Sequence, residues 1–260
     1  MSTKYNSILF IGDSIFGNTF TTSNFIDNFQ TQNPLVTIER VQQDGTSYGH
    51  PSTGDSYLSN LQASNVNPAE AVVIGTGINA LNPMGSLTLT SPIEVADTIS
   101  RVDELVGSIY DIMPFTDIYF MRPLPLNASP EVLTWYLTTE EVLYKSLDNL
   151  NKVVEYQSVN FPIINVGDIL GTIGSVDPSL YMADKLHPND AGHVVLGNFF
   201  NTYFSAPAKP NSDPQVNLDN YKTYWATGSI ASGRDWGTKR LNADGEIMGN
   251  YVHTDFPEYN

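Results

Sequence analysis

Four side chains in this sequence are of the types that carry out acyl transfer. Ser14 ends a Gly-Asp-Ser string and offers a hydroxyl nucleophile. His187 lies three residues after Asp184, so a carboxylate can hold one imidazole nitrogen while the other nitrogen takes the serine proton. Asn79 ends a Gly-Ile-Asn string and offers an amide donor to a developing oxyanion. The order of these strings and their positions at element ends predict a single acyl-transfer site.

An oxyanion site needs further donors, and the segment after the second predicted strand can supply one. Residues 43–49 are mostly small and flexible, and we predict the backbone amide of Gly45 as the donor, with Gly49 as the weaker choice. The backbone amide of Ser14 would complete the oxyanion hole. Candidate substrate contacts in the neighbouring and later loops are Tyr48, His50 and Trp135.

Each of these residues also has a structural explanation. Ser14 alone can be a helix N-cap, and Asn79 can be a turn residue that tolerates a positive φ. Asp184 can cap a helix beside a solvated His187. Gly45 can belong to an ordinary loop. The combination of residues, rather than any one of them, therefore carries the chemical interpretation.

Apolar runs alternate with amphipathic stretches along the chain. The runs predict strands over residues 7–11, 36–42, 71–75, 117–121 and 161–166. Helices are predicted over residues 23–30, 92–113, 138–154 and 189–204. In the last helix we expect a structural His193 and an inward face made by Ala191, Val194, Val195, Phe199 and Phe200. The alternation favours an α/β fold with a parallel sheet between helical layers, which binds ligands beyond the carboxyl ends of its strands.

The composition limits the possible classes of function. The chain has 260 residues and a formal net charge of −16, which would repel phosphate backbones and anionic membrane surfaces, so nucleic-acid binding is not expected. Its apolar stretches are far shorter than the roughly 18 residues of a membrane-spanning helix, and its first residues do not resemble a secretory signal. It has no cysteine, which excludes disulfides and thiolate metal sites. We expect a soluble protein, cytoplasmic or virion-associated.

A change in composition after residue 205 predicts a domain boundary. Residues 206–214 are rich in proline and indicate an extended linker. We expect one domain over residues 1–205. Residues 206–260 would then form a linker and a Gly- and aromatic-rich appendage, with a hairpin around Asp244-Gly245, that serves attachment or oligomerisation.

The strings taken together resemble the conserved blocks of the SGNH hydrolases, the GDSL-type esterases and lipases, over about residues 7–204. The resemblance implies a flavodoxin-like three-layer α/β/α fold with a five-stranded parallel sheet of order 2-1-3-4-5. It also implies ester or thioester hydrolysis without a metal or cofactor. The residues that match the family's catalytic and oxyanion positions are Ser14, Gly45, Asn79, Asp184 and His187.

Two positions depart from the family pattern. Ile15 replaces the leucine that usually follows the nucleophile. Ala80 stands where an acid usually follows the asparagine. Neither change removes a catalytic group, but Ala80 could alter how the loop that carries Asn79 is held.

The expected function is that of a serine esterase, with O-deacetylation of a carbohydrate as the favoured reaction. The chain has no long apolar insertion that would hold a fatty chain. A lipase or thioesterase is the alternative on the same fold, and a catalytically silent virion-associated structural or glycan-binding module is the alternative from another class. The expected partners are an acylated small molecule or glycan, and further copies of the chain or a virion through the appendage.

Overall fold

A computed structural model of the protein describes residues 3–49, 56–75, 77–81, 89–166, 169–172 and 174–205. Five parallel strands form the central sheet, in the order β2-β1-β3-β4-β5. The strands are β1 (Ser7–Gly12), β2 (Thr37–Gln42), β3 (Ala71–Ile74), β4 (Asp117–Met121) and β5 (Ile163–Ile164). The predicted fold and strand order are therefore confirmed. The predicted appendage, 206–260, lies outside the described residues, so the domain boundary stays a prediction.

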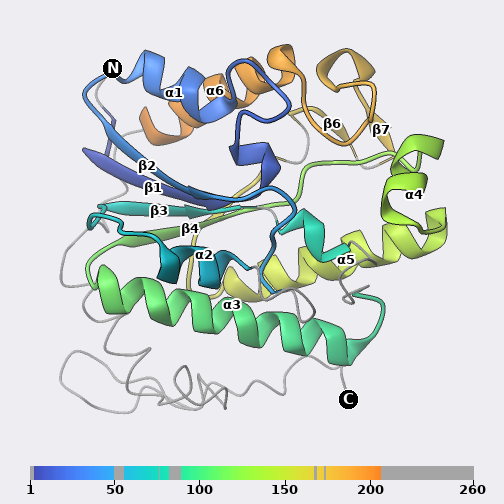
Figure 1. Cartoon of the computed structure of the whole chain (residues 1–260), viewed down its shortest axis with the longest axis horizontal. Helices are drawn as coiled ribbons and strands as arrows, with labels where there is room; N and C mark the ends of the chain where they lie inside the picture. The colour runs from blue at the N-terminus through green and yellow to red at the C-terminus, as the bar shows by residue number, and fades with distance from the viewer. Residues whose placement is uncertain are drawn as a thin grey trace.

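Helices cover both faces of the sheet, as Figure 1 shows. One layer holds α1 (Phe25–Gln32) and α6 (Asp190–Ser205). The other layer holds α2 (Tyr57–Ala63), α3 (Pro92–Ile112) and α5 (Glu140–Gln157). At one end of the sheet lie α4 (Pro130–Tyr136) and the hairpin of β6 (Gly171–Thr172) and β7 (Ser175–Val176). None of the described helices combines the length and apolar composition needed to cross a bilayer.

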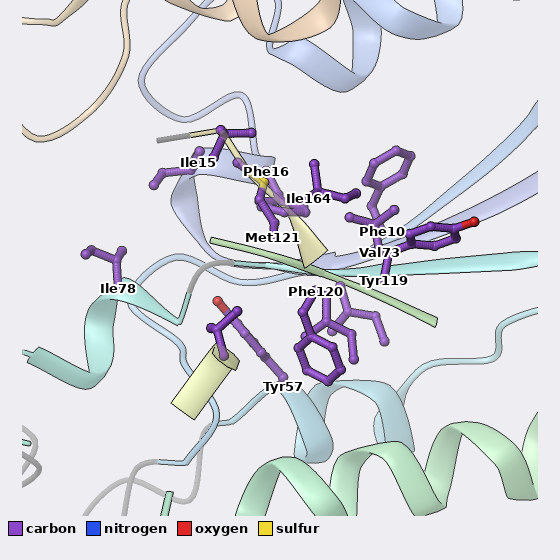
Figure 2. Packing of buried hydrophobic residues seen from close by; sticks show 14 of the residues in the cluster. Phe10, Ile15, Phe16, Tyr57, Val73, Ile78, Tyr119, Phe120, Met121 and Ile164 are labelled. Atoms are coloured by element: carbon purple, nitrogen blue, oxygen red, sulfur yellow. The ribbon is translucent and has the colours of Figure 1, made fainter. Parts of the chain in front are cut away.

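The buried strands explain why the sheet is central to the core. β1, β3 and β4 are apolar along nearly their whole length and are almost completely buried, as parallel strands with helices on both faces must be. Figure 2 shows side chains from these strands packed together. The fifth strand is shorter than the predicted range 161–166, since only Ile163 and Ile164 pair with β4. Pro162 precedes this pair and has no N–H for a ladder, which suits an edge strand.

Two short helices were not predicted. α2 begins after the N-cap Ser56 and α4 after the N-cap Ser129, and each has seven residues. Two turns are too few for a hydrophobic period to be recognised. As a result, Trp135 lies on α4 rather than in a loop.

The predicted inward face of α6 is partly wrong. Ala191 and Val194 are exposed, Val194 to 45%, whereas the buried residues are Gly192, His193, Leu196, Gly197, Phe200 and Phe204. Gly197 explains why the buried face of α6 differs from the predicted one. A Cβ atom at this position would lie 2.7 Å from Cβ of Asn28 and 3.0 Å from the carbonyl oxygen of Phe25. The glycine allows α6 to lie close to α1, and this contact, rather than the apolar period, sets the buried face.

His193 makes the α1–α6 contact sensitive to pH. Its Nδ1 accepts a hydrogen bond from the backbone N–H of Phe25 at 3.2 Å, and burial lowers its pKa from 6.5 to about 4. Because the unfolded chain binds the proton at a higher pH, the free energy of unfolding should fall as the pH drops from about 6.5 to about 4. Over that window the loss from His193 should reach about 3 kcal/mol.

Urea unfolding at pH 7.5 and pH 4.5 measures this effect. His193→Asn keeps an acceptor for the Phe25 N–H but does not titrate, so this variant should lose less stability than the wild type between the two pH values. Equal losses in both proteins would show that the pH dependence has another source.

Candidate active site

Ser14 is placed at the carboxyl end of β1 by a tight turn. It opens the 3-10 turn η1 (Ser14–Phe16), which Asp13 caps by accepting the N–H of Ile15 at 3.0 Å. The turn folds the ring of Phe16 against Gly12, where a Cβ atom would lie 2.4 Å from Phe16 Cγ. The Gly-Asp-Ser string therefore has a local cause: glycine allows the close approach, aspartate caps the turn, and serine is its first residue.

The structure brings Ser14, His187 and Asp184 into one hydrogen-bonded chain. Ser14 Oγ lies 2.9 Å from His187 Nε2, and His187 Nδ1 lies 2.8 Å from Asp184 Oδ2. The other carboxylate oxygen of Asp184 accepts the backbone N–H groups of Leu186 at 2.9 Å and His187 at 3.0 Å. The Asp-Lys-Leu-His string is thus a compact turn whose own backbone orients the carboxylate.

These contacts also determine the ionisation of Asp184. Burial tends to raise the pKa of Asp184, but the hydrogen bonds from the His187 ring and from the backbone N–H groups of His187 and Leu186 outweigh it and lower the pKa. An ionised Asp184 accepts the Nδ1 proton of a neutral imidazole. His187 Nε2 then faces Ser14 Oγ as an acceptor, which is the arrangement that general-base catalysis requires.

Asn79 lies in the 3-10 turn η2 (Ile78–Leu81) after β3, where it is buried. Its Nδ2 donates to the carbonyl oxygen of Thr46 at 3.0 Å. This bond fixes which end of the amide is the nitrogen. Among the described residues, the second N–H of this amide has no other partner. The bond to Thr46 also ties the loop after β3 to the loop after β2.

Gly45 and Gly49, the two predicted backbone donors, differ in the space around them. Gly45 has φ +77° and open space where a Cβ atom would lie. A Cβ atom at Gly49 would instead lie 2.2 Å from the side chain of Arg101, so Gly49 packs against α3. Within the described ranges, the N–H groups of Ser14 and Gly45 make no hydrogen bond to protein, which leaves both open to a ligand.

The predicted substrate contacts have different outcomes. Tyr48 is only 1% exposed, and its hydroxyl donates to the carbonyl oxygen of Gly75 at 2.9 Å, so it supports the loop and does not line a binding surface as predicted. Trp135 is 50% exposed and lies edge-on to His187, with ring centroids 6.4 Å apart. His50 lies outside the described residues.

Two residues at the site were missed. The ring of Phe20 stacks on His187 with centroids 3.9 Å apart, and the hydroxyl of Tyr57 contacts both Asp13 and Gly77. Phe20 lies in irregular backbone and Tyr57 begins an unpredicted helix, so no periodic pattern marked either residue.

Two hollows border the aromatic neighbours of His187. Phe20 lines a hollow of about 660 Å³, and Trp135 lines another of about 590 Å³. The other residues of the first hollow are Thr19, Thr21, Thr22, Met182, Asn189, Asp190 and Ala191. Those of the second are Pro130, Glu131, Thr134 and Leu137. In the described part of the chain, no group of three or more His, Asp or Glu side chains is arranged to hold a metal ion.

No protein-family model and no curated protein matches the chain. Solved structures do match its fold. An aryl esterase from M. smegmatis is 14% identical with a TM-score of 0.56, covering 77% of this chain and 99% of its own. An acetylxylan esterase from Geobacillus stearothermophilus, solved as a catalytic mutant, is 17% identical with a TM-score of 0.53, covering 80% and 97%. A GDSL-like lipase from Bacteroides thetaiotaomicron is 14% identical with a TM-score of 0.54, covering 77% and 88%. The chain therefore has the SGNH hydrolase fold.

Proposed function

We propose that the protein is a serine ester hydrolase. The observation that carries the proposal is the hydrogen-bonded chain from Ser14 through His187 to Asp184. Ser14 Oγ attacks the acyl carbon while His187 Nε2 takes its proton, and the imidazolium then gives that proton to the departing alcohol. Water attacks the acyl group on Ser14 with the same base, which releases the acid and restores the serine.

The negative charge of each tetrahedral intermediate falls on the former carbonyl oxygen. We assign its stabilisation to the N–H groups of Ser14 and Gly45 and to the second Nδ2–H of Asn79. The open backbone amides and the fixed orientation of the Asn79 amide support this role. Each such donor is typically worth about 2.7–4 kcal/mol in the transition state.

The favoured substrate is an acetylated carbohydrate. His187 must protonate the departing alcohol, so the alcohol has to lie near the two aromatic residues that contact this ring, Phe20 and Trp135. Aromatic faces pack well on the apolar faces of sugar rings. Two surface hollows adjoin these residues, one lined by Phe20 and the other by Trp135. The likeness to an acetylxylan esterase supports this choice.

A lipase-like activity is the second candidate, and one observation favours it. The hollow beside α4 is lined mainly by apolar groups, among them Pro130, Trp135 and Leu137, and it could receive an acyl chain. The two candidates differ in the part of the ester that this hollow would bind. In a deacetylase it would bind the alcohol, and in a lipase it would bind the acyl chain.

Kinetics with a panel of esters separates the two candidates. We expect acetate release from acetylated xylo-oligosaccharides, and p-nitrophenyl acetate to be cleaved faster than p-nitrophenyl octanoate. Trp135→Ala should raise KM for the acetylated oligosaccharide by about tenfold through loss of ring packing, with less change for p-nitrophenyl acetate. Phe115→Ala, which removes an exposed aromatic ring before β4, is the control. A preference for octanoate that is lost in Trp135→Ala would support the lipase instead.

A further inference from the structure

We propose that Tyr57 is a positioning residue that holds the nucleophile turn and the oxyanion turn in fixed relation through one hydroxyl group. The proposal rests on the proposed hydrolase function. Tyr57 does not contact the reacting atoms in this scheme. It would act through Asp13 on the turn of Ser14, and through Gly77 on the turn of Asn79.

The first contact is to the cap of the nucleophile turn. Tyr57 Oη donates to Asp13 Oδ2 at 2.9 Å, while Asp13 Oδ1 accepts the N–H of Ile15 at 3.0 Å. Asp13 has no exposed surface, so a partner lost from its carboxylate is not replaced by bulk water. The hydroxyl of Tyr57 therefore fixes the side chain that caps η1, the turn that opens with Ser14.

The second contact is to the start of the oxyanion turn. The same Tyr57 Oη accepts the backbone N–H of Gly77 at 3.2 Å. Gly77 has φ +65°, and its carbonyl oxygen accepts the N–H of Ala80 at 2.8 Å, which closes η2 around Asn79. One hydroxyl thus donates to the residue before η1 and accepts from the residue before η2.

Tyr57 is itself held firmly enough to act as a reference point. It is the first residue of α2, after a capping box formed by Ser56 and Ser59, and its backbone N–H donates to the carbonyl oxygen of Ser47 at 2.8 Å. Its ring meets that of Tyr48 edge-to-face, with centroids 5.4 Å apart. In Figure 2 Tyr57 rises from α2, with Ile78 of η2 and Ile15 of η1 on the side of its hydroxyl.

Tyr48 supports the same loop from a second position. Its hydroxyl donates to the carbonyl oxygen of Gly75, and a Cβ atom at Gly77 would lie 2.2 Å from its ring. These two tyrosines lie beside the loop of Asn79. In this loop the buried Ala80 stands where SGNH hydrolases usually have an acidic residue. The two tyrosines offer a physical account of how the loop of Asn79 keeps its position without that acid.

The consequence is a specific effect on the chemical step. Oxyanion donors stabilise the transition state only when they are already oriented before charge develops, and small displacements of such groups have large effects on rate. Tyr57→Phe keeps the ring and removes only the shared hydroxyl. We expect kcat for p-nitrophenyl acetate to fall by about 10- to 100-fold with little change in KM.

Tyr5→Phe is the matched control. Tyr5 is a buried tyrosine whose hydroxyl contacts Asp117 and Tyr119. Tyr5 precedes β1 and Asp117 opens β4, at the end of these strands opposite to Ser14. Tyr5→Phe should lower the melting temperature and leave kcat unchanged, whereas Tyr57→Phe should lower kcat at temperatures where it is fully folded.

The outcomes separate the two proposals. If the wild type cleaves no ester in the panel, the hydrolase proposal fails and the role of Tyr57 fails with it. If the wild type is active and Tyr57→Phe retains its kcat, or loses only what Tyr5→Phe loses, the positioning role alone is overturned. Should Tyr57→Phe not fold, Tyr48→Phe replaces it, since removal of the bond to Gly75 should also lower kcat without raising KM; an unchanged kcat would then overturn the proposal.

Discussion

Replacing Ser14 with alanine is expected to lower kcat/KM for p-nitrophenyl acetate by about 10⁴- to 10⁶-fold, because no other group is proposed to form the bond to the acyl carbon. The fold should persist. Among the described residues, the side chain of Ser14 makes one hydrogen bond, to His187, and the turn around it is capped by Asp13. Initial rates measured with purified protein, corrected for spontaneous hydrolysis, give the comparison.

Ser7→Ala controls for loss of a hydroxyl from the same strand. Ser7 opens β1 at the opposite end from Ser14, and its Oγ accepts the backbone N–H of Glu70 at 3.0 Å. This variant should keep the wild-type rate. Equal rates in the wild type and Ser14→Ala would contradict the assignment of the nucleophile.

Asp184→Asn is expected to lower kcat by about 10⁴-fold. The amide oxygen of asparagine can still accept the N–H groups of Leu186 and His187, as Asp184 Oδ1 does. Its amide nitrogen would then face His187 Nδ1 as a donor, which places the imidazole proton on Nε2, toward Ser14. The turn is preserved, but the base holds its proton on the wrong nitrogen.

The pH dependence of kcat provides a second test of Asp184→Asn. In the wild type, activity should fall in acid, because the proposed mechanism needs an unprotonated base. The lowered pKa of Asp184 should keep this carboxylate ionised through that fall. Without its negative charge the imidazolium is less stable, so the remaining activity of Asp184→Asn should fall at a lower pH.

Asp177→Asn is the control for these measurements. Asp177 accepts the N–H and the hydroxyl of Ser179 in a similar local turn, but it is exposed and makes no hydrogen bond to a histidine in the described part of the chain. Asp177→Asn changes the net charge by the same amount as Asp184→Asn, but it should affect neither kcat nor the pH dependence of activity. An unchanged kcat in Asp184→Asn would argue against its role as the partner of the base.

Much of the site could be predicted from the sequence because short motifs position their own side chains. The Asp184 carboxylate is oriented by the backbone N–H groups of Leu186 and His187, and Ser14 is placed by the cap of its turn and by Gly12. Such short-range causes leave a pattern in the sequence. The strand order was implied by a resemblance carried by the same strings, and the structure confirms it. The catalytic roles themselves stay predictions.

The remaining features depend on contacts between distant segments. The buried face of α6 is set by the close approach of Gly197 to α1, a contact that an apolar period does not show. Phe20 is identified only by its position on His187. Tyr57 contacts two loops that are far from it in the sequence. Side chains whose importance comes from tertiary packing leave no local signal.

The proposed mechanism requires Ser14 to form a covalent bond with the substrate's acyl group. Its most direct test is mass spectrometry of the wild type and Ser14→Ala after treatment with a fluorophosphonate, which modifies an activated serine and mimics the tetrahedral intermediate. We expect one adduct per wild-type chain, on the peptide that contains Ser14, with simultaneous loss of esterase activity, and no adduct on Ser14→Ala. An active wild type that carries no adduct, or an adduct at another residue, would contradict the assignment of Ser14 as the nucleophile.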